Sequence, residues 1–151
     1  MNIVLVHPQI PQNTGNIARL CAGTDTTLHL IRPLGFSLED KYVRRAGLDY
    51  WPHVNLQVHD SLEEALAGVD PANVAYYSAR ATRSYLEFAP PGEPYFVFGR
   101  EADGLPPEVL SAERERAYRV PTNDKIRSLN LANTCAIVLF ESMRQSGLEP
   151  G

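Results

Sequence analysis

The sequence predicts an α/β domain with a mostly parallel sheet and helices on both faces. Short runs rich in β-branched and aromatic residues alternate along the chain with segments whose apolar residues recur at helical spacing. This alternation is typical of strand–helix–strand units, in which a crossover helix leads the chain to a parallel neighbouring strand. The chain has 151 residues, of which 44% are hydrophobic and 21% charged. This length and composition predict one globular domain over residues 1–151.

Six strands are expected from short runs bounded by glycine, proline or aspartate. They are residues 2–7, 27–32, 54–58, 73–78, 94–98 and 117–120. The main helices expected are one after a turn at Gly15, a short one over 38–47, one opening at Ser61, and one from Asn130 to Gln145. Ligands bind at the carboxyl ends of strands in such sheets, so the loops after the strands are where a site is expected.

Composition excludes several classes of protein. No apolar run approaches the roughly 20 residues that span a bilayer, and the N-terminus lacks a signal peptide, so a cytoplasmic protein without membrane contact is expected. Cys21 and Cys135 are expected to be buried free thiols, and the four histidines lack metal-ligand spacing, so no metal is expected. The net charge of −4 argues against coating nucleic acid by bulk charge, although local basic clusters remain available.

The first loop of interest is "IPQNTGNIARLC", residues 10–21. A dinucleotide fingerprint would need three glycines and a distant acidic residue, but the loop has one glycine, and Arg32 stands where the acid would be. An oxidoreductase is therefore disfavoured. Asn13 and Arg19 instead suit a phosphate or a sugar. The alternative is that Asn13 only caps the helix and Arg19 is a surface residue.

Two later loops carry similar chemistry. In "FGREADGLP", residues 98–106, two glycines allow close backbone approach and Glu101 holds a carboxylate at the rim. In "VPTNDKIRSLNLANT", residues 120–134, a polar loop leads from a strand into an apolar helix. The alternatives are an ordinary strand-to-helix loop with a solvated Glu101, and simple helix capping by Ser128 or Asn130.

Taken in order, these loops resemble a known family. The pattern N-x5-R at Asn13–Arg19, F-G-x-E-x-x-G-L at 98–105 and S-L-N at 128–130 is similar to the three motifs of the SPOUT RNA 2′-O-ribose methyltransferases. The segment "RRAGLDYW", residues 44–51, resembles the minimal YibK/TrmL-type members, which methylate the wobble nucleotide, cytidine or modified uridine, of leucine tRNAs. The resemblance covers nearly the whole chain and implies a catalytic domain without a separate RNA-binding extension.

The resemblance implies a sheet with a deep C-terminal trefoil knot, S-adenosylmethionine as cofactor, tRNA as substrate, and a homodimer whose active site is completed across the interface. It also implies roles for particular residues. The catalytic set is Arg19, Asn13, Glu101, Ser128 and Asn130. The cofactor contacts are Tyr77, Gly99, Val120, Pro121, Ser128 and Leu129. The residues expected to bind the tRNA anticodon loop are Lys41, Arg44, Arg45, Arg80, Arg83 and Lys125.

Arginine is effectively always protonated, so Arg19 is not expected to be the base that takes the 2′-hydroxyl proton. It is expected to grip the adjoining phosphate and polarise the hydroxyl, while the other four catalytic residues fix the ribose and the arginine. Two alternatives stay open: a methyltransferase for another tRNA or rRNA position, and a non-catalytic RNA-binding domain that has kept the knot.

Overall fold

The computed structural model describes residues 1–39, 41, 45 and 50–151. Within them, seven strands form one sheet in the order β3-β2-β1-β6-β4-β7-β5, and every strand pairing is parallel. The strands are β1 Asn2–Val6, β2 Thr27–Ile31, β3 Leu56–His59, β4 Val74–Tyr77, β5 Arg83–Ser84, β6 Tyr95–Phe98 and β7 Ala117–Arg119. The predicted α/β class and parallel sheet are therefore confirmed.

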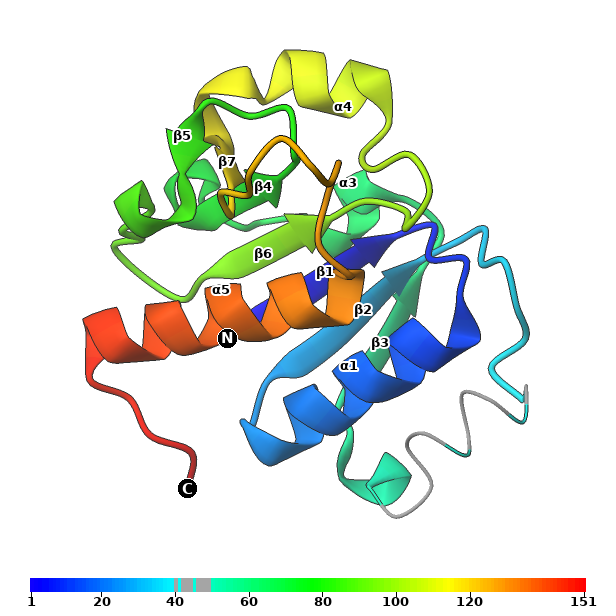
Figure 1. The fold of residues 1–151 in the computed structure, drawn as a ribbon. Helices are drawn as coiled ribbons and strands as arrows, with labels where there is room; N and C mark the ends of the chain where they lie inside the picture. Colours follow the sequence, from blue (N-terminus) through cyan, green and yellow to red (C-terminus); the bar gives the residue numbers. More distant parts are fainter. Residues whose placement is uncertain (40, 42–44, 46–49) are drawn as a thin grey trace.

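Helices cover both faces of this sheet (Figure 1). The α-helices are α1 Pro11–Gly23, α3 Leu62–Ala65, α4 Pro107–Ala112 and α5 Leu131–Ser146. Short 3-10 helices are η1 Trp51–His53, η2 Pro71–Asn73, η3 Tyr85–Glu87 and η4 Arg114–Arg116. None of the helices in the described ranges is long and apolar enough to cross a membrane.

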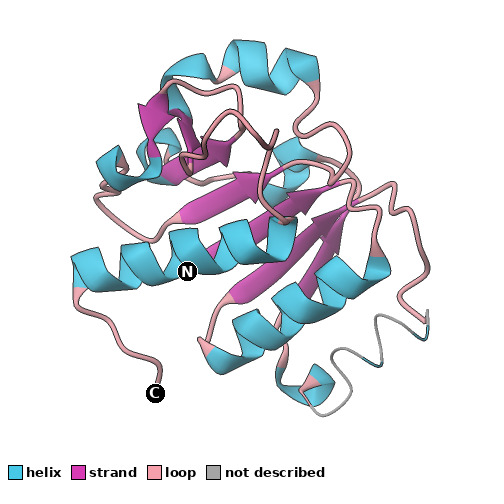
Figure 2. Cartoon of the chain, viewed as in Figure 1, coloured by secondary structure: helices cyan, strands magenta, loops and turns pink. Residues whose placement is uncertain are grey.

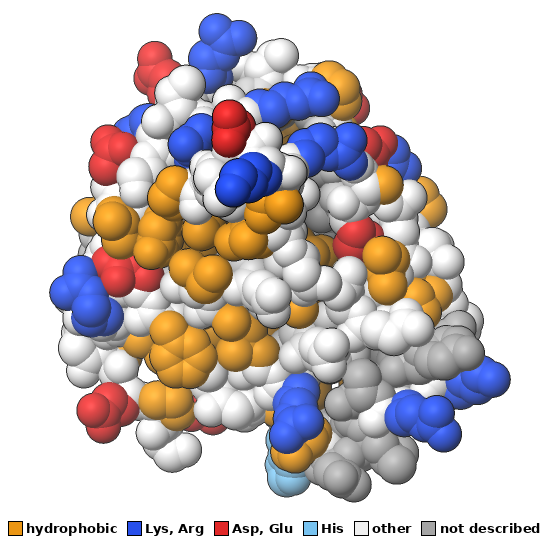
Figure 3. Space-filling view, in the orientation of Figure 1, with side chains coloured by type: hydrophobic (Ala, Val, Ile, Leu, Met, Phe, Trp, Pro, Cys, Tyr) orange, Lys and Arg blue, Asp and Glu red, His pale blue; other side chains and the backbone are white. Residues whose placement is uncertain are grey.

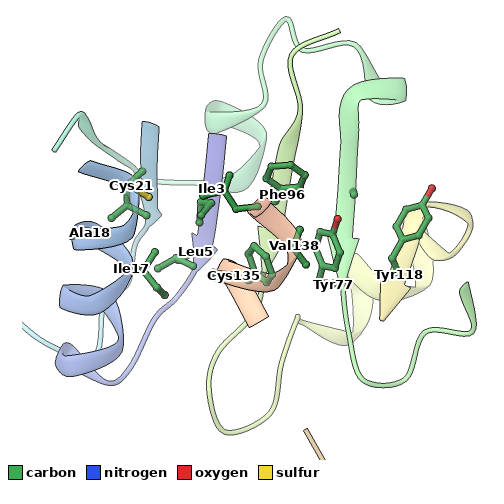
Figure 4. Close-up of a cluster of buried hydrophobic side chains, with 14 of the residues drawn as sticks. Ile3, Leu5, Ile17, Ala18, Cys21, Tyr77, Phe96, Tyr118, Cys135 and Val138 are labelled. Atoms are coloured by element: carbon green, nitrogen blue, oxygen red, sulfur yellow. The ribbon is translucent and has the colours of Figure 1, made fainter. Parts of the chain in front are cut away.

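Side chains of the central strands point alternately to the two faces of the sheet, which produces two hydrophobic cores. Ile3 and Leu5 of β1 face α1 and α5, where they pack with Ile17 and Cys135 (Figure 4). The intervening β1 residues point the other way, into a smaller cluster that includes side chains of α3 and α4. Successive side chains of a strand point to opposite faces, so a strand buried on both sides is apolar throughout, as β1 is.

Helix α5 matches its predicted position and ends at Gly147, whose φ of +70° gives a left-handed C-cap. Gly15, by contrast, was expected in a turn and lies within α1, which begins at Pro11 because proline is suited to a first helical position. The two-residue strand β5 was not predicted, since Arg83 and Ser84 form no apolar run. The helix expected over 38–47 falls largely outside the described residues.

Strand order decides which loops can meet. Strand β6 lies between β1 and β4, and β7 follows β4, so the carboxyl ends of these four strands are neighbours. Figure 2 shows the connecting loops gathered at the ends to which the strand arrows point. The three motif loops, which follow β1, β6 and β7, are therefore brought to one edge of the sheet.

Candidate functional site

A cavity of about 230 Å³ opens at the carboxyl ends of β4, β6 and β7. Tyr77 and Phe98 line it with their rings stacked, the centroids 4.9 Å apart. Burial raises the pKa of the Tyr77 phenol well above its ordinary value, so this wall carries no charge. Val120, Leu129 and Leu131 add further apolar surface. An apolar wall edged by loop backbone is suited to a flat heterocycle.

Five of the six residues predicted to bind the cofactor line this cavity. They are Tyr77, Gly99, Val120, Ser128 and Leu129. The sixth, Pro121, is exposed and is not part of the lining. The structure thus brings together residues that lie up to 52 positions apart in the chain, from Tyr77 to Leu129.

The loop after β6 is shaped by two glycines. A Cβ built on Gly99 would lie 2.0 Å from the carbonyl carbon of Gly104, and both that atom and the equally close Leu105 nitrogen belong to the backbone. Two backbone hydrogen bonds, of 3.1 and 2.9 Å, pair Arg100 with Gly104, and Gly104 has a φ of +74°. The loop folds tightly back on the end of β6, and a side chain at Gly99 has no space there.

Hydrogen bonds tie the three motif loops to one another. The Glu101 carboxylate accepts the backbone N–H groups of Gln9 at 2.8 Å and Ile10 at 3.1 Å, which joins the second loop to the first. The Asn130 amide donates to Asn13 Oδ1 at 3.1 Å, which joins the third loop to the first. Arg127 donates to the Ala102 carbonyl at 2.8 Å, joining the third loop to the second.

Glu101 and Asn130 also act as helix caps. Ile10, the N-cap residue of α1, makes no capping hydrogen bond with its own side chain, and the Glu101 carboxylate from another loop accepts its backbone N–H. A negative charge there is favoured by the helix dipole. Asn130 accepts the Asn133 N–H and caps α5 in the ordinary way. With both oxygens bound to backbone donors, Glu101 serves to hold the loop of α1 in place.

Arg19 lies apart from these residues. Its guanidinium packs over the Tyr50 ring, 4.6 Å from the ring centroid, and it does not line the cavity. Arg19 lies six positions after Asn13, which turns the two side chains about 120° apart around α1. Asn13 is buried against Asn130, whereas Arg19 is exposed. One chain therefore does not bring the two together.

The predicted RNA-binding residues fall into different settings. Arg80 lines the cavity, and Lys125 is exposed in the loop after β7. Arg83 packs over Tyr118 and donates to the Glu115 carbonyl at 2.6 Å, so its guanidinium is held at the sheet edge. Lys41 and Arg45 are exposed, and Arg44 lies outside the described residues.

Sequence reasoning did not assign three further arginines of the cavity wall: Arg100, Arg119 and Arg127. Figure 3 shows lysine and arginine side chains gathered around the upper part of the molecule, over the loops that follow the strands. The position of Arg127 directly before the S-L-N motif was the available signal. Among the described residues, no group of three potential ligands could hold a metal ion.

Residues 1–140 match the model of the SpoU rRNA methylase family. The chain belongs to this family. A relative from Burkholderia cenocepacia, named tRNA (cytidine(34)-2′-O)-methyltransferase, is 46% identical over 153 residues, covering 99% of this chain and 98% of its own. The resemblance that the motifs indicated is thereby confirmed.

Solved structures of other proteins share this fold. One, described as giving insight into 2-OH methylation of C/U34 on tRNA, has a TM-score of 0.87 and 43% identity, and the match covers 97% of this chain and 95% of that one. The SpoU methyltransferase AviRb from Streptomyces viridochromogenes, in complex with AdoMet, has a TM-score of 0.83 at 18% identity, covering 97% of this chain and 57% of that one. At that identity the likeness concerns the fold alone.

Proposed function

We propose that this SpoU methylase transfers a methyl group from S-adenosylmethionine to the ribose 2′-hydroxyl of nucleotide 34 of tRNA, and that leucine tRNAs are its substrates. The observation that carries the proposal is one cavity lined by the second and third motif loops, both hydrogen-bonded to the first, in a chain 46% identical to a protein named for this reaction. The pairwise hydrogen bonds between these loops give the preorganisation that catalysis by positioning requires.

The cavity fits S-adenosylmethionine in its chemistry. Tyr77, Phe98 and Leu129 offer apolar surface for adenine, and the backbone around Gly99 and Val120 offers donors and acceptors for its edge. Its volume of about 230 Å³ is below the usual range for such ligands, roughly 300 Å³ upward, so part of the cofactor would remain at the open rim. When bound, this group supplies a methyl carbon made electrophilic by a sulfonium.

The protein's contribution is to align the 2′-oxygen with that carbon and to help its proton leave. In our proposal Arg19 holds the phosphate beside nucleotide 34 and polarises the hydroxyl, because a guanidinium donates hydrogen bonds but does not accept a proton at neutral pH. Ser128 would contact the ribose from the cavity wall. Asn13, Glu101 and Asn130 act by holding α1 and the third loop in register. The proton leaves through phosphate or water.

A second copy of the chain is proposed to complete the site. Arg19 is exposed on α1, and α5 beside it exposes Ile137 and Phe140, which are 37% and 51% accessible. Figure 3 shows hydrophobic side chains gathered on this face of the molecule. Burying them in a symmetric dimer would bring Arg19 of one protomer toward the cavity of the other.

The C-terminal segment is also proposed to form a deep trefoil knot. Support comes from the course of residues 121–130, which leave β7, run against Ala102 through Arg127, and then return to α1 through Asn130. Connections that thread a loop are rare in proteins. Stretching the chain from its two ends in a single-molecule instrument tests this: a knotted chain reaches a shorter final length than an unknotted one, and full extension would contradict the knot.

Methyl transfer to defined RNA tests the proposed function. Unmodified leucine tRNA should accept one methyl group at nucleotide 34, and the same tRNA with a 2′-deoxyribose at that position should accept none. Mapping of 2′-O-methylation after incubation with total RNA separates the alternatives. Methylation at another tRNA or rRNA position would replace the substrate, and binding of tRNA without any transfer would indicate a non-catalytic domain.

Arg19→Ala provides the matching test at residue level. This variant should lose nearly all turnover while keeping its affinity for S-adenosylhomocysteine, because Arg19 does not line the cofactor cavity. Affinity can be measured by calorimetry and turnover by transfer of labelled methyl. Turnover close to that of the unsubstituted protein would contradict the role given to Arg19.

A further inference from the structure

A second cavity, of about 410 Å³, borders the first along a shared wall. Both cavities are lined by Ser78, Arg80, Arg100, Asp103 and Gly104. Its volume lies within the range of roughly 300 to 1,000 Å³ that holds small organic groups. A ligand in this cavity would therefore lie next to one bound at the proposed methyl-transfer site.

The walls of the second cavity combine apolar surface with a few polar groups. Pro106, Pro107 and Leu110 supply the apolar part, and His7 contributes an imidazole ring. The side chain of Glu108 adds a carboxylate, which can accept a hydrogen bond from an exocyclic amino group. A ring that can stack, an apolar surface and a hydrogen-bond acceptor are what a nucleobase requires.

Charge within the shared wall is concentrated at Arg80. The Arg100 guanidinium forms a bidentate ion pair with Asp103, which neutralises it. Arg80 is exposed, and across the described ranges its guanidinium has no hydrogen-bond or ion-pair partner. An unpaired guanidinium between two cavities is suited to a phosphate of a strand that passes from the rim of the first cavity to the second.

His7 is held in an unusual backbone conformation. It follows β1 directly and has a φ of +54°, in the left-handed region that residues other than glycine seldom adopt. Its N–H donates to the Ile31 carbonyl at 3.1 Å, and its ring Nδ1 lies 3.3 Å from the same oxygen. Donation from Nδ1 leaves Nε2 as an acceptor. Strained residues of this kind concentrate at binding sites.

We propose that the second cavity is a subsite for the base of a nucleotide adjoining the methylated one, with Arg80 on the phosphate that joins the two. This inference rests on the proposed function, because it takes the first cavity as the site of methyl transfer. The methylated ribose must lie at the open rim of the first cavity, beside the cofactor, and the second cavity shares a wall with the first, so the next nucleotide of the strand can reach it. The base must be unpaired to enter, which a single-stranded loop allows and a duplex does not.

Base removal combined with substitution of His7 tests the subsite. Anticodon stem-loop RNAs lacking the base at position 33 or at position 35 are compared with the intact RNA. Their dissociation constants are measured by fluorescence anisotropy with S-adenosylhomocysteine present. At one of the two positions, base removal should weaken binding to the unsubstituted protein about 5-fold or more, the scale of one stacked base. His7→Asn should abolish that penalty, because asparagine tolerates the left-handed backbone but removes the ring.

His53→Ala, at an exposed histidine of η1 that lines neither cavity, is the control and should retain the full penalty. The proposal is overturned if base removal has no effect at either position, or if His7→Asn shows the same penalty as the unsubstituted protein. Failure of the proposed function would give a different result. The unsubstituted protein would then transfer no methyl to nucleotide 34, whether or not His7→Asn abolishes the penalty of base removal.

Salt dependence tests the part given to Arg80. Arg80→Gln should lower the slope of log affinity for the stem-loop against log salt by about 0.7, the value for one phosphate contact to a single strand. Arg114→Gln removes the same charge from an exposed arginine outside both cavities and should leave the slope unchanged. Because Arg80 also lines the first cavity, affinity for S-adenosylhomocysteine is measured for both variants. A loss of that affinity in Arg80→Gln with an unchanged slope would assign Arg80 to the cofactor and overturn its role on the phosphate.

Discussion

Gly99 leaves no room for a side chain. A methyl group there would overlap backbone atoms of Gly104 and Leu105 at 2.0 Å, and backbone cannot rotate away as a flexible side chain would. We expect Gly99→Ala to lower the free energy of unfolding by about 2 kcal/mol or more. Urea denaturation measures this. Gly23→Ala is the control, because a methyl group at Gly23 meets nothing within 4 Å, and equal stability of the two variants would contradict the steric argument.

The lowered pKa of the buried His29 ring determines how we expect stability to change with pH. Its ring lies 3.0 Å from His59 Nε2 and 3.0 Å from Asn2 Oδ1. Burial first, and then the charge of His59, lower the pKa of His29 from 6.5 to about 4, against a smaller raising effect of Glu93. Between these values the unfolded chain binds a proton that the folded protein does not. Stability should therefore fall as pH decreases from 6.5 toward 4.

The unfolding free energy cannot change by more than about 1.4 kcal/mol per pH unit for one proton, and solvent screening makes this change smaller. Urea denaturation at several pH values measures it. His29→Gln, which does not titrate, should flatten this part of the profile, while His53→Ala should not, because His53 is exposed. An unchanged profile in His29→Gln would show that other groups cause the acid sensitivity.

At the level of elements, Glu101 connects the loop after β6 to the start of α1. Glu101→Gln would leave one acceptor oxygen for two backbone donors, those of Gln9 and Ile10, and would turn an amide NH2 toward the other. We expect a loss of about 1 to 2 kcal/mol in unfolding free energy. Hydrogen exchange should accelerate at the first turn of α1 and remain unchanged in α5.

Glu149→Gln, at an exposed residue near the C-terminus, is the matched control and should alter neither quantity. If exchange at α1 is unaffected in Glu101→Gln, the carboxylate does not hold the helix start. Turnover then distinguishes the possibilities, since a loss of activity without loosening of α1 would mean that Glu101 contacts the substrate itself.

The elements were predictable to different degrees for physical reasons. Strands such as 94–98 and helix α5 were found because their apolar periodicity reflects burial. The start of α1 was misplaced because its cap comes from Glu101, which is 91 positions away from Ile10. Strand β5 was missed because pairing with β7, rather than its own composition, makes it a strand.

The site was predictable where a motif supplied the residues. The pattern identified Gly99, Ser128 and Leu129, and all three line the cavity. The pattern could not reveal that Asn13 is buried against Asn130 while Arg19 is exposed, because this depends on the direction in which each side chain leaves α1. The wall arginines Arg100 and Arg119 reach the cavity through tertiary packing, which no local pattern records.

At the scale of the whole molecule, the position of Arg19 outside the cavity suggests a test of the dimer. Leu129→Arg should block the cofactor cavity, since Leu129 lines it. Arg19→Ala should remove the proposed contact with the phosphate beside nucleotide 34. Each variant alone should be inactive. In a mixed dimer, the open cavity of the Arg19→Ala protomer can meet the intact Arg19 of the Leu129→Arg protomer. An equal mixture should then regain about one quarter of the unsubstituted activity, because half of the dimers are mixed and each has one complete site.

The recovery depends on Arg19 acting across the interface. If Arg19 served the cavity of its own chain, both protomers of a mixed dimer would remain defective and no activity would return. A protomer carrying both substitutions, mixed with Arg19→Ala, is the control and should stay inactive in either case. Sedimentation of the mixture establishes whether dimers form and exchange. Dimers that exchange without recovering activity would exclude a shared site, and a purely monomeric protein would require a single chain to bring Arg19 to the cavity by moving it away from Tyr50.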